Sequence, residues 1–147
     1  MDGEIRFLLR PASSSIRQSL IEWVFSPIDE NLWSATFDVI AGLFSVNFST
    51  EIIPQDWQAF IDQLQVLHDT LAGDAVLTDV HGHRVLRLTI LSQARGQVLI
   101  SGLFVDQFGC PDSDSLAKGS ANRFEFSHLV LDQTGIREAL QQFRRAM

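Results

Sequence analysis

Three side chains of the types that bind metal ions lie close together in the sequence, at Asp79, His81 and His83. Residues two apart on a strand face the same side, and histidine and aspartate are common zinc ligands. Gly82, however, stands between the two histidines and favours a tight turn, in which the side chains need not converge. We therefore predict that the protein binds no metal, with a metal site at this turn as the alternative.

The other two histidines, His68 and His128, fall on apolar faces of a predicted helix and a predicted strand. A histidine in such a place is more often hydrogen-bonded at the edge of a core than a metal ligand. We expect both to be structural.

Cys110 is the only cysteine, so the chain can form neither an internal disulfide nor a CxxC site. It stands in a polar loop predicted from Phe108 to Asn122, where Asp112 and Asp114 would disfavour the thiolate that a nucleophile requires. We expect an inert thiol. Adjacent carboxylates, such as Asp112 and Asp114, could act in hydrolysis only inside an apolar cleft.

The sequence contains no GxGxxG, GxxxxGK[ST], HExxH or GxSxG motif. We expect that the protein is not an enzyme and has no cofactor. Two alternatives remain open: a small-ligand-binding or enzymatic domain, whose pocket would be lined by His68, His128 or the His81 and His83 pair, and an adaptor subunit of a larger assembly.

The acidic residues are distributed unevenly. From Gln18 to His83 the chain has ten acidic residues and no lysine or arginine, whereas the remainder has 8 acidic and 11 basic residues. The formal charge of −7 is therefore the sum of −10 for this acidic block and +3 for the rest. Such a charge disfavours nucleic acid and anionic membrane as partners and favours a basic protein.

The N-terminal segment and the hydropathy pattern predict the location. Asp2 and Glu4 precede only a short apolar run, which is not typical of a secretory leader. No stretch approaches the roughly 20 apolar residues that span a bilayer. Together with the single cysteine, this pattern leads us to expect a cytoplasmic protein.

Alternation with a period of two predicts eight strands. The first contains Ile5, Phe7 and Leu9, and the fourth alternates Phe44, Val46 and Phe48 with polar residues, as expected when one face of a sheet is solvated. The others are predicted at Leu20–Phe25, Trp33–Val39, Ala75–Val80, Arg84–Ser92, Gln97–Asp106 and Arg123–Leu131.

Two segments have the period of a helix. From Pro54 to Leu71, apolar residues recur at helical spacing and Gly73 follows where a left-handed residue often ends a helix. The apolar stripe comprises Trp57, Phe60, Ile61, Leu64, Leu67, His68 and Leu71, flanked by Gln58, Asp62, Gln65 and Asp69. The second helix is predicted from Thr134 to Arg145, with Asp132 as its cap.

The 147 residues therefore predict a single domain, 1–147, of the α+β class. Short connections between consecutive strands favour antiparallel pairing. We expect a strongly curved antiparallel sheet of about seven to eight strands, with one central and one C-terminal helix packed on it, in the order ββββ-α-ββββ-α.

From about Phe37 to the C-terminus, the chain resembles the WapI-type immunity proteins, which are encoded beside bacterial polymorphic or contact-dependent toxins. The similar features are the helix Trp57–Leu64 ending near Leu71–Ala75, the strands Leu86–Ile90 and Gly96–Gly102, and the endings Phe124–Phe126 and Leu131–Thr134. The resemblance implies a non-enzymatic cytoplasmic protein that binds and neutralises a cognate toxin domain. It carries over no catalytic residue.

A basic toxin domain, for example a nuclease, would be a suitable partner for the acidic block. We predict that its binding site draws on five residues. These are Asp29 and Glu30 in a polar turn, Asp62 and Asp69 on the exposed flank of the first helix, and Trp33 as an apolar anchor. For Trp33, a place in the core is the alternative, because it lies in an alternating strand.

Overall fold

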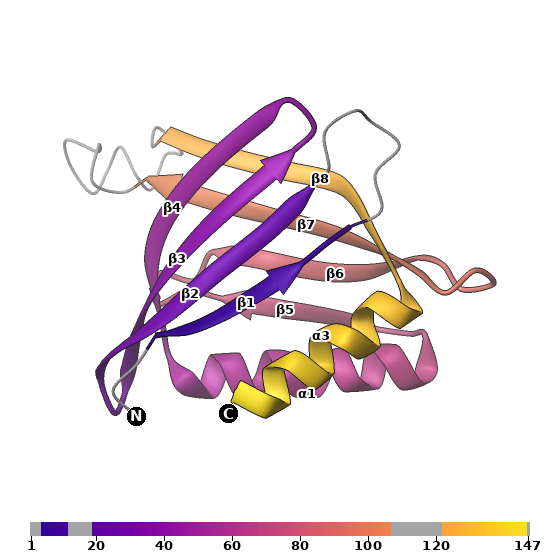
Figure 1. Ribbon diagram of the computed structural model, residues 1–147, viewed down its shortest axis with the longest axis horizontal. Helices are drawn as coiled ribbons and strands as arrows, with labels where there is room; N and C mark the ends of the chain where they lie inside the picture. The colour runs from indigo at the N-terminus through magenta and orange to yellow at the C-terminus, as the bar shows by residue number, and fades with distance from the viewer. Residues whose placement is uncertain (1–3, 12–18, 107–121, 147) are drawn as a thin grey trace.

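The computed structural model describes residues 4–11, 19–106 and 122–146. Within these ranges the chain forms eight strands and two helices in the predicted order ββββ-α-ββββ-α (Figure 1). The strands are β1 Ile5–Leu9, β2 Leu20–Asp29, β3 Leu32–Ala41, β4 Phe44–Ile52, β5 Asp74–Thr78, β6 Arg84–Ser92, β7 Gln97–Asp106 and β8 Asn122–Asp132. The helices are α1 Pro54–Thr70 and α3 Gln133–Ala146. The α+β class is confirmed.

All strand pairs are antiparallel, as predicted, but the strands form two sheets of four instead of one curved sheet. Their orders are β1-β2-β3-β4 and β5-β6-β7-β8. Helix α1 separates the two sets along the chain, and β5 pairs with β6 rather than with β4. In Figure 1 the strands of one sheet cross those of the other, so each sheet covers the inner face of its partner.

The core lies between the two sheets. Strand alternation places Phe7, Phe37 and Val39 on the inner face of the first sheet, and Leu88, Ile100 and Phe104 on that of the second, all buried. Direct contact between the sheets comes from Phe104, whose ring centroid lies 5.5 Å from that of Phe37 and 4.5 Å from that of Phe48. One hydrophobic cluster includes residues of both sheets and both helices.

The two helices lie side by side across one end of the sheets (Figure 1). Helix α1 buries Trp57, Phe60, Ile61, Leu64 and Leu67, which confirms five of the seven residues of the predicted stripe. The other two, His68 and Leu71, are half-buried. The Trp57 ring contacts Phe7 at 5.0 Å and Phe143 of α3 at 4.9 Å, centroid to centroid. The helices are therefore joined to each other and to β1 by aromatic packing.

The ends of the helices follow the sequence closely. Helix α1 begins with Pro54 in its first turn and ends at Thr70. The next residue, Leu71, caps the helix in the left-handed conformation at φ 50°, two residues before Gly73. Helix α3 is capped as predicted, because the Gly135 N–H donates to Asp132 Oδ1 at 2.7 Å.

Glutamine side chains of the helices bond to the outer edges of the two sheets. Gln142 of α3 accepts from the Leu8 N–H at 2.8 Å and donates to the Leu8 carbonyl at 3.0 Å, along β1. Gln63 of α1 accepts from the Val76 N–H of β5 at 2.9 Å. The helices thus satisfy backbone groups of two edge strands that would otherwise be open to pairing.

Strand β2 is longer than the sequence predicts. The strand was predicted to end at Phe25, but β2 continues through Ser26 and Pro27 to Asp29. Proline lacks an N–H but is tolerated at bulges, and the β2 to β3 register shifts between Pro27 and Asp29. In β7, a Cβ at Gly102 would overlap Val85 O and the Phe126 ring, so only glycine fits beside these groups.

The loop predicted from Phe108 to Asn122 lies outside the described residues, with Cys110, Asp112 and Asp114, apart from Asn122, which begins β8. In the described part of the chain, neither α1 nor α3 combines the length and apolar character that crossing a bilayer requires.

Candidate protein-binding site

The hairpin between β2 and β3 forms a pocket of about 400 Å³ with one end of α3. It contains three of the five predicted binding residues, Asp29, Glu30 and Trp33. Its remaining lining comes from Ile5, Phe25, Pro27 and Ala146. We refer to these seven residues as the hairpin pocket.

Trp33 forms part of the floor of the hairpin pocket. It is half-buried, and its ring lies 5.2 Å from that of Phe25, which in turn lies 4.9 Å from Trp57 of α1. One part of the indole therefore packs on the core and another part faces the pocket, and its role as an anchor for a partner stays a prediction. Packing against buried rings limits the rotamers of Trp33, which favours a preorganised contact.

The acidic side chains Asp29 and Glu30 stand at the rim of the hairpin pocket, and both are exposed. Asp29 Oδ1 accepts a hydrogen bond from the Asn31 N–H at 2.7 Å, which stabilises the turn. Within the described ranges, neither carboxylate forms an ion pair. The rim thus presents two negative charges above an apolar floor.

Asp62 and Asp69 do not line the hairpin pocket. They lie two turns apart on the exposed flank of α1, where Gln58 donates to Asp62 at 3.0 Å and Gln65 to Asp69 at 2.9 Å. The predicted polar flank is confirmed. Hydrogen bonds from His68, at 2.9 Å, and from Gln65 hold the pKa of the Asp69 carboxyl below its ordinary value.

Two other acidic residues of the block form ion pairs within the molecule. Glu22 pairs with Arg6 across β1 and β2, and Asp74 pairs with Arg87 at 2.7 Å across β5 and β6. Both arginines lie outside the block in sequence, so part of its charge is neutralised by contacts that sequence distance conceals. The exposed charge of the hairpin rim and of the α1 flank remains.

The candidate metal residues at 79, 81 and 83 build a turn. Asp79 is buried, and its Oδ1 accepts from the N–H groups of His81 and His83, both at 3.0 Å. Its Oδ2 accepts from Thr50 Oγ1 at 2.9 Å, which ties the turn to β4.

In the described part of the chain, no three histidine, cysteine, aspartate or glutamate side chains gather as metal ligands. The ring centroids of His81 and His83 are 6.3 Å apart. Elemental analysis after dialysis tests the prediction of a metal-free protein, and a stoichiometric zinc signal would contradict it. His68 is half-buried and bonded to Asp69, as expected for a residue at the edge of the core, whereas the side chain of His128 lies outside the description.

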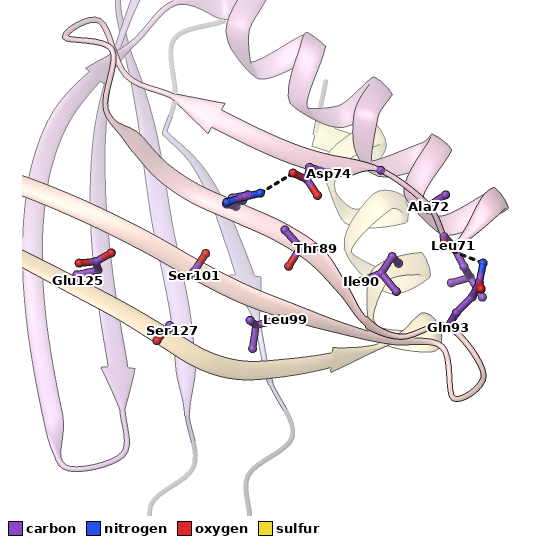
Figure 2. A pocket seen from close by; sticks show the side chains of 12 residues that line it. Leu71, Ala72, Asp74, Thr89, Ile90, Gln93, Leu99, Ser101, Glu125 and Ser127 are labelled. Atoms are coloured by element: carbon purple, nitrogen blue, oxygen red, sulfur yellow. Dashed lines mark hydrogen bonds and ion pairs between the residues drawn. The ribbon is translucent and has the colours of Figure 1, made fainter.

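A second concave surface of about 620 Å³ crosses the outer face of the second sheet (Figure 2). Figure 2 shows Thr89, Ser101 and Glu125 on neighbouring strands, with Asp74 at one side in its ion pair with Arg87. Of the histidines that the enzymatic alternative requires, the three whose side chains are described, His68, His81 and His83, do not line this groove. The charges of Asp74 and Arg87 in this groove neutralise each other.

Ile5 and Ala146 of the hairpin pocket were not predicted as site residues. They come from the two ends of the chain, and only the packing of β1 and α3 beside the hairpin brings them to Trp33. The structural cause is the extension of β2 past Pro27, which the sequence did not predict and which pairs Pro27 with Trp33 in the β2 to β3 register.

Comparison with family models, curated proteins and solved structures finds no match to this chain. The resemblance to WapI-type immunity proteins therefore stays a prediction.

Proposed function

We propose that this protein is a cytoplasmic immunity protein that binds and neutralises a basic toxin domain, and that the hairpin pocket is the centre of its binding surface. The composition of the pocket carries the proposal. Trp33 and Phe25 supply an apolar floor, and Asp29 and Glu30 supply an acidic rim. Protein interfaces commonly combine aromatic anchors with a polar rim of this kind.

The charge of the exposed surface supports a basic partner. Asp29, Glu30 and Asp62 are exposed, and no basic side chain in the described ranges pairs with them. Complementary charges increase the rate at which two proteins meet, and this increase falls with ionic strength. A nuclease with a basic substrate cleft has the matching chemistry.

The test is binding to the C-terminal domain encoded by the neighbouring gene, measured at low and high salt. We expect the double variant Asp29→Lys, Glu30→Lys to associate more slowly and with a weaker dependence on salt. Trp33→Ala is expected to dissociate faster, by roughly tenfold or more, because truncating an aromatic anchor commonly costs about 2 kcal/mol. Its free energy of unfolding is measured in parallel, since Trp33 also packs on Phe25.

A matched control separates the site from net charge. The double variant Glu125→Lys, Glu138→Lys changes the total charge equally at two exposed residues outside the acidic block. The variant Asp62→Lys, Asp69→Lys reports the part played by the α1 flank. If the wild type does not bind the neighbouring domain, the proposed function is wrong. If the hairpin reversal associates as fast as the control variant with the same salt dependence, the site is wrong.

A further inference from the structure

Strand β4 has an open edge. In the described part of the chain it pairs only with β3, through a register that ends at Ala41 and Phe44 around the two-residue turn Gly42-Leu43. Gly42 has φ 62°, as expected for the first central residue of a type II′ turn. The residues that flank such a turn form a hydrogen-bonded pair, and such pairs alternate along the ladder. The backbone groups of Ser45, Asn47 and Ser49 therefore point away from β3.

One hydrogen bond confirms this orientation. Glu51 continues the alternation of Ser45, Asn47 and Ser49, and its carbonyl accepts from the Val80 N–H at 3.0 Å, outside the β3 to β4 ladder. The turn after β5 thus occupies the β4 edge at Glu51, and no other described residue bonds to the outward backbone groups nearer the hairpin. Three residues with outward N–H and C=O groups span about 13 Å at roughly 3.3 Å per residue, which is long enough for a short added strand.

A groove of about 610 Å³ runs along this edge. On one side it is lined by Asn47–Glu51 of β4, with Ile28 and Ser34, and on the other by Val105, Asp106 and His81. The groove separates β4 from the end of β7. An extended segment bound to the β4 edge would lie in it.

The apolar row of β4 is only partly covered. Phe44, Val46 and Phe48 alternate toward the inner face, as predicted, but Phe44 is 67% exposed and the other two are half-buried. Ile28, in the groove, is 55% exposed. An added strand with apolar residues at alternate positions would cover this row beside Phe104, on which Phe48 stacks.

The charged residues of β4 and of its neighbour β3 are all acidic. Asp38 lies beside Asn47 in the register and accepts a hydrogen bond from its side chain at 2.6 Å. Glu51 lies where the Val80 N–H covers the edge. The other open edge, β8, lies outside the acidic block and carries Arg123 as well as Glu125. A second copy of this chain would bring its own Asp38 and Glu51 against these acidic groups.

We propose that the β4 edge binds an extended segment of a basic partner protein, with alternating apolar and basic residues, which adds a fifth strand to the first sheet. Main-chain hydrogen bonds to Ser45, Asn47 and Ser49 hold the segment, and the row of Phe44, Val46 and Phe48 selects its apolar positions. This surface is separate from the hairpin pocket, and the proposal holds whether or not the partner is a toxin.

The test uses the full chain and a capped nonapeptide of alternating valine and lysine, followed by amide hydrogen exchange. In the free protein we expect the N–H groups of Val46 and Phe48 to be protected and those of Asn47 and Ser49 to exchange fast. The peptide is expected to slow exchange at Asn47 and Ser49. A peptide of alternating valine and glutamate is the charge control and is expected to leave exchange unchanged.

A variant pair tests the backbone bonds directly. Asn47→Pro removes one outward N–H and is tolerated on an edge strand, whereas Asn47→Ala keeps the amide and loses only the bond to Asp38. We expect Asn47→Pro to weaken peptide binding about tenfold and Asn47→Ala about twofold or less, where tenfold corresponds to about 1.4 kcal/mol. The exchange experiment on the wild type decides the question if Asn47→Pro does not fold.

Three results would overturn the proposal: protection at β8 instead of β4, equal binding of the glutamate peptide, or a dimer in sedimentation that the lysine peptide does not dissociate. A dimer of that kind would identify a second copy as the occupant. Normal binding of the neighbouring domain by Asn47→Pro would leave the hairpin pocket as the toxin site, so the two proposals fail separately.

Discussion

The edges of the two sheets differ in what covers them. β1 and β5 are bonded to glutamines of α3 and α1, at Leu8 and Val76. In the described part of the chain, by contrast, the outer backbone edge of β4 is bonded only at Glu51, by the turn that Asp79 organises. Helices in this fold therefore close one end of the sheets, and the opposite end keeps unpaired backbone and partly exposed apolar side chains.

The contrast shows how a small protein can combine a rigid core with an adaptable surface. The closed end contains the buried aromatic residues Trp57, Phe7 and Phe143. The open end contains Phe44 and Leu43, which is 84% exposed. Exposed apolar residues beside an unpaired strand are a liability for aggregation, so a sequence that retains them is expected to use them in binding.

The largest expected effect is at the closed end. Leu64 is buried in the stripe of α1, and we expect Leu64→Ala to lower the free energy of unfolding by roughly 2–5 kcal/mol, because it removes buried methyl groups and leaves a cavity. Val66→Ala on the same helix is the control, since Val66 is 56% exposed and surface substitutions change stability by about 0.5 kcal/mol or less. A loss at Leu64 as small as the control would show that α1 does not anchor the closed end.

The next effect is at the boundary between the two ends. Asp79→Ala removes the acceptor of two turn N–H groups and of Thr50 Oγ1, in a buried place. We expect a loss of at least roughly 1.5–3 kcal/mol in denaturant unfolding, which is the range for a single hydrogen bond to a charged group, because three such bonds are removed. Faster exchange of the Val80 amide would show that the β4 edge has opened further. Thr50→Val, which removes only one of the three donors, is expected to cost less.

A smaller effect is expected from the glutamine that covers β1. Gln142→Ala removes two hydrogen bonds with Leu8, and at about 0.5–1.5 kcal/mol each we expect a loss of roughly 1–3 kcal/mol. Gln141→Ala, at the exposed neighbouring residue, is the control. The Leu8 amide should exchange faster in Gln142→Ala alone. If the Leu8 amide exchanged equally fast in both variants, Gln142 would not protect the β1 edge, and the contrast with the open β4 edge would be wrong.

Periodicity predicted most of the fold because each pattern depends on the local geometry of one strand or one helix. A period of two indicates which side chains of a strand face inward, and the buried Phe37 and Val39 follow it. Helical spacing likewise predicted the buried face of α1. These patterns do not record which strands belong to one sheet, since inward faces of both sheets are equally apolar. That β4 and β5 belong to different sheets could therefore be seen only in the structure.

The site was predictable in part. The charge block and the aromatic residue indicated Asp29, Glu30 and Trp33, which the hairpin pocket brings together. Asp79 was interpreted as a possible metal ligand. An aspartate at the start of a turn can instead accept a hydrogen bond from the backbone N–H two residues later, as Asp79 does from His81, which is an Asx turn. The open edge of β4 had no sequence signal, because whether a strand lies at an edge depends on the sheet order.

The smallest expected effect concerns the exposed flank of α1, the helix that covers β5 with its other side. His68 and Gln65 lower the pKa of Asp69 below its ordinary value of 3.8, so the folded state favours the charged carboxylate. The stabilisation is therefore fully present above the unfolded value and is lost as the pH falls below 3.8 through the folded value. We expect Asp69→Asn to flatten the pH dependence of the free energy of unfolding in that range and to leave the stability at neutral pH almost unchanged.

In an NMR titration of the carboxyl, His68→Ala should raise the pKa of Asp69 more than Gln65→Ala does, because the His68 bond is the larger cause. The opposite order would mean that the flank is organised by its glutamines, like the covered edges, and not by its histidine.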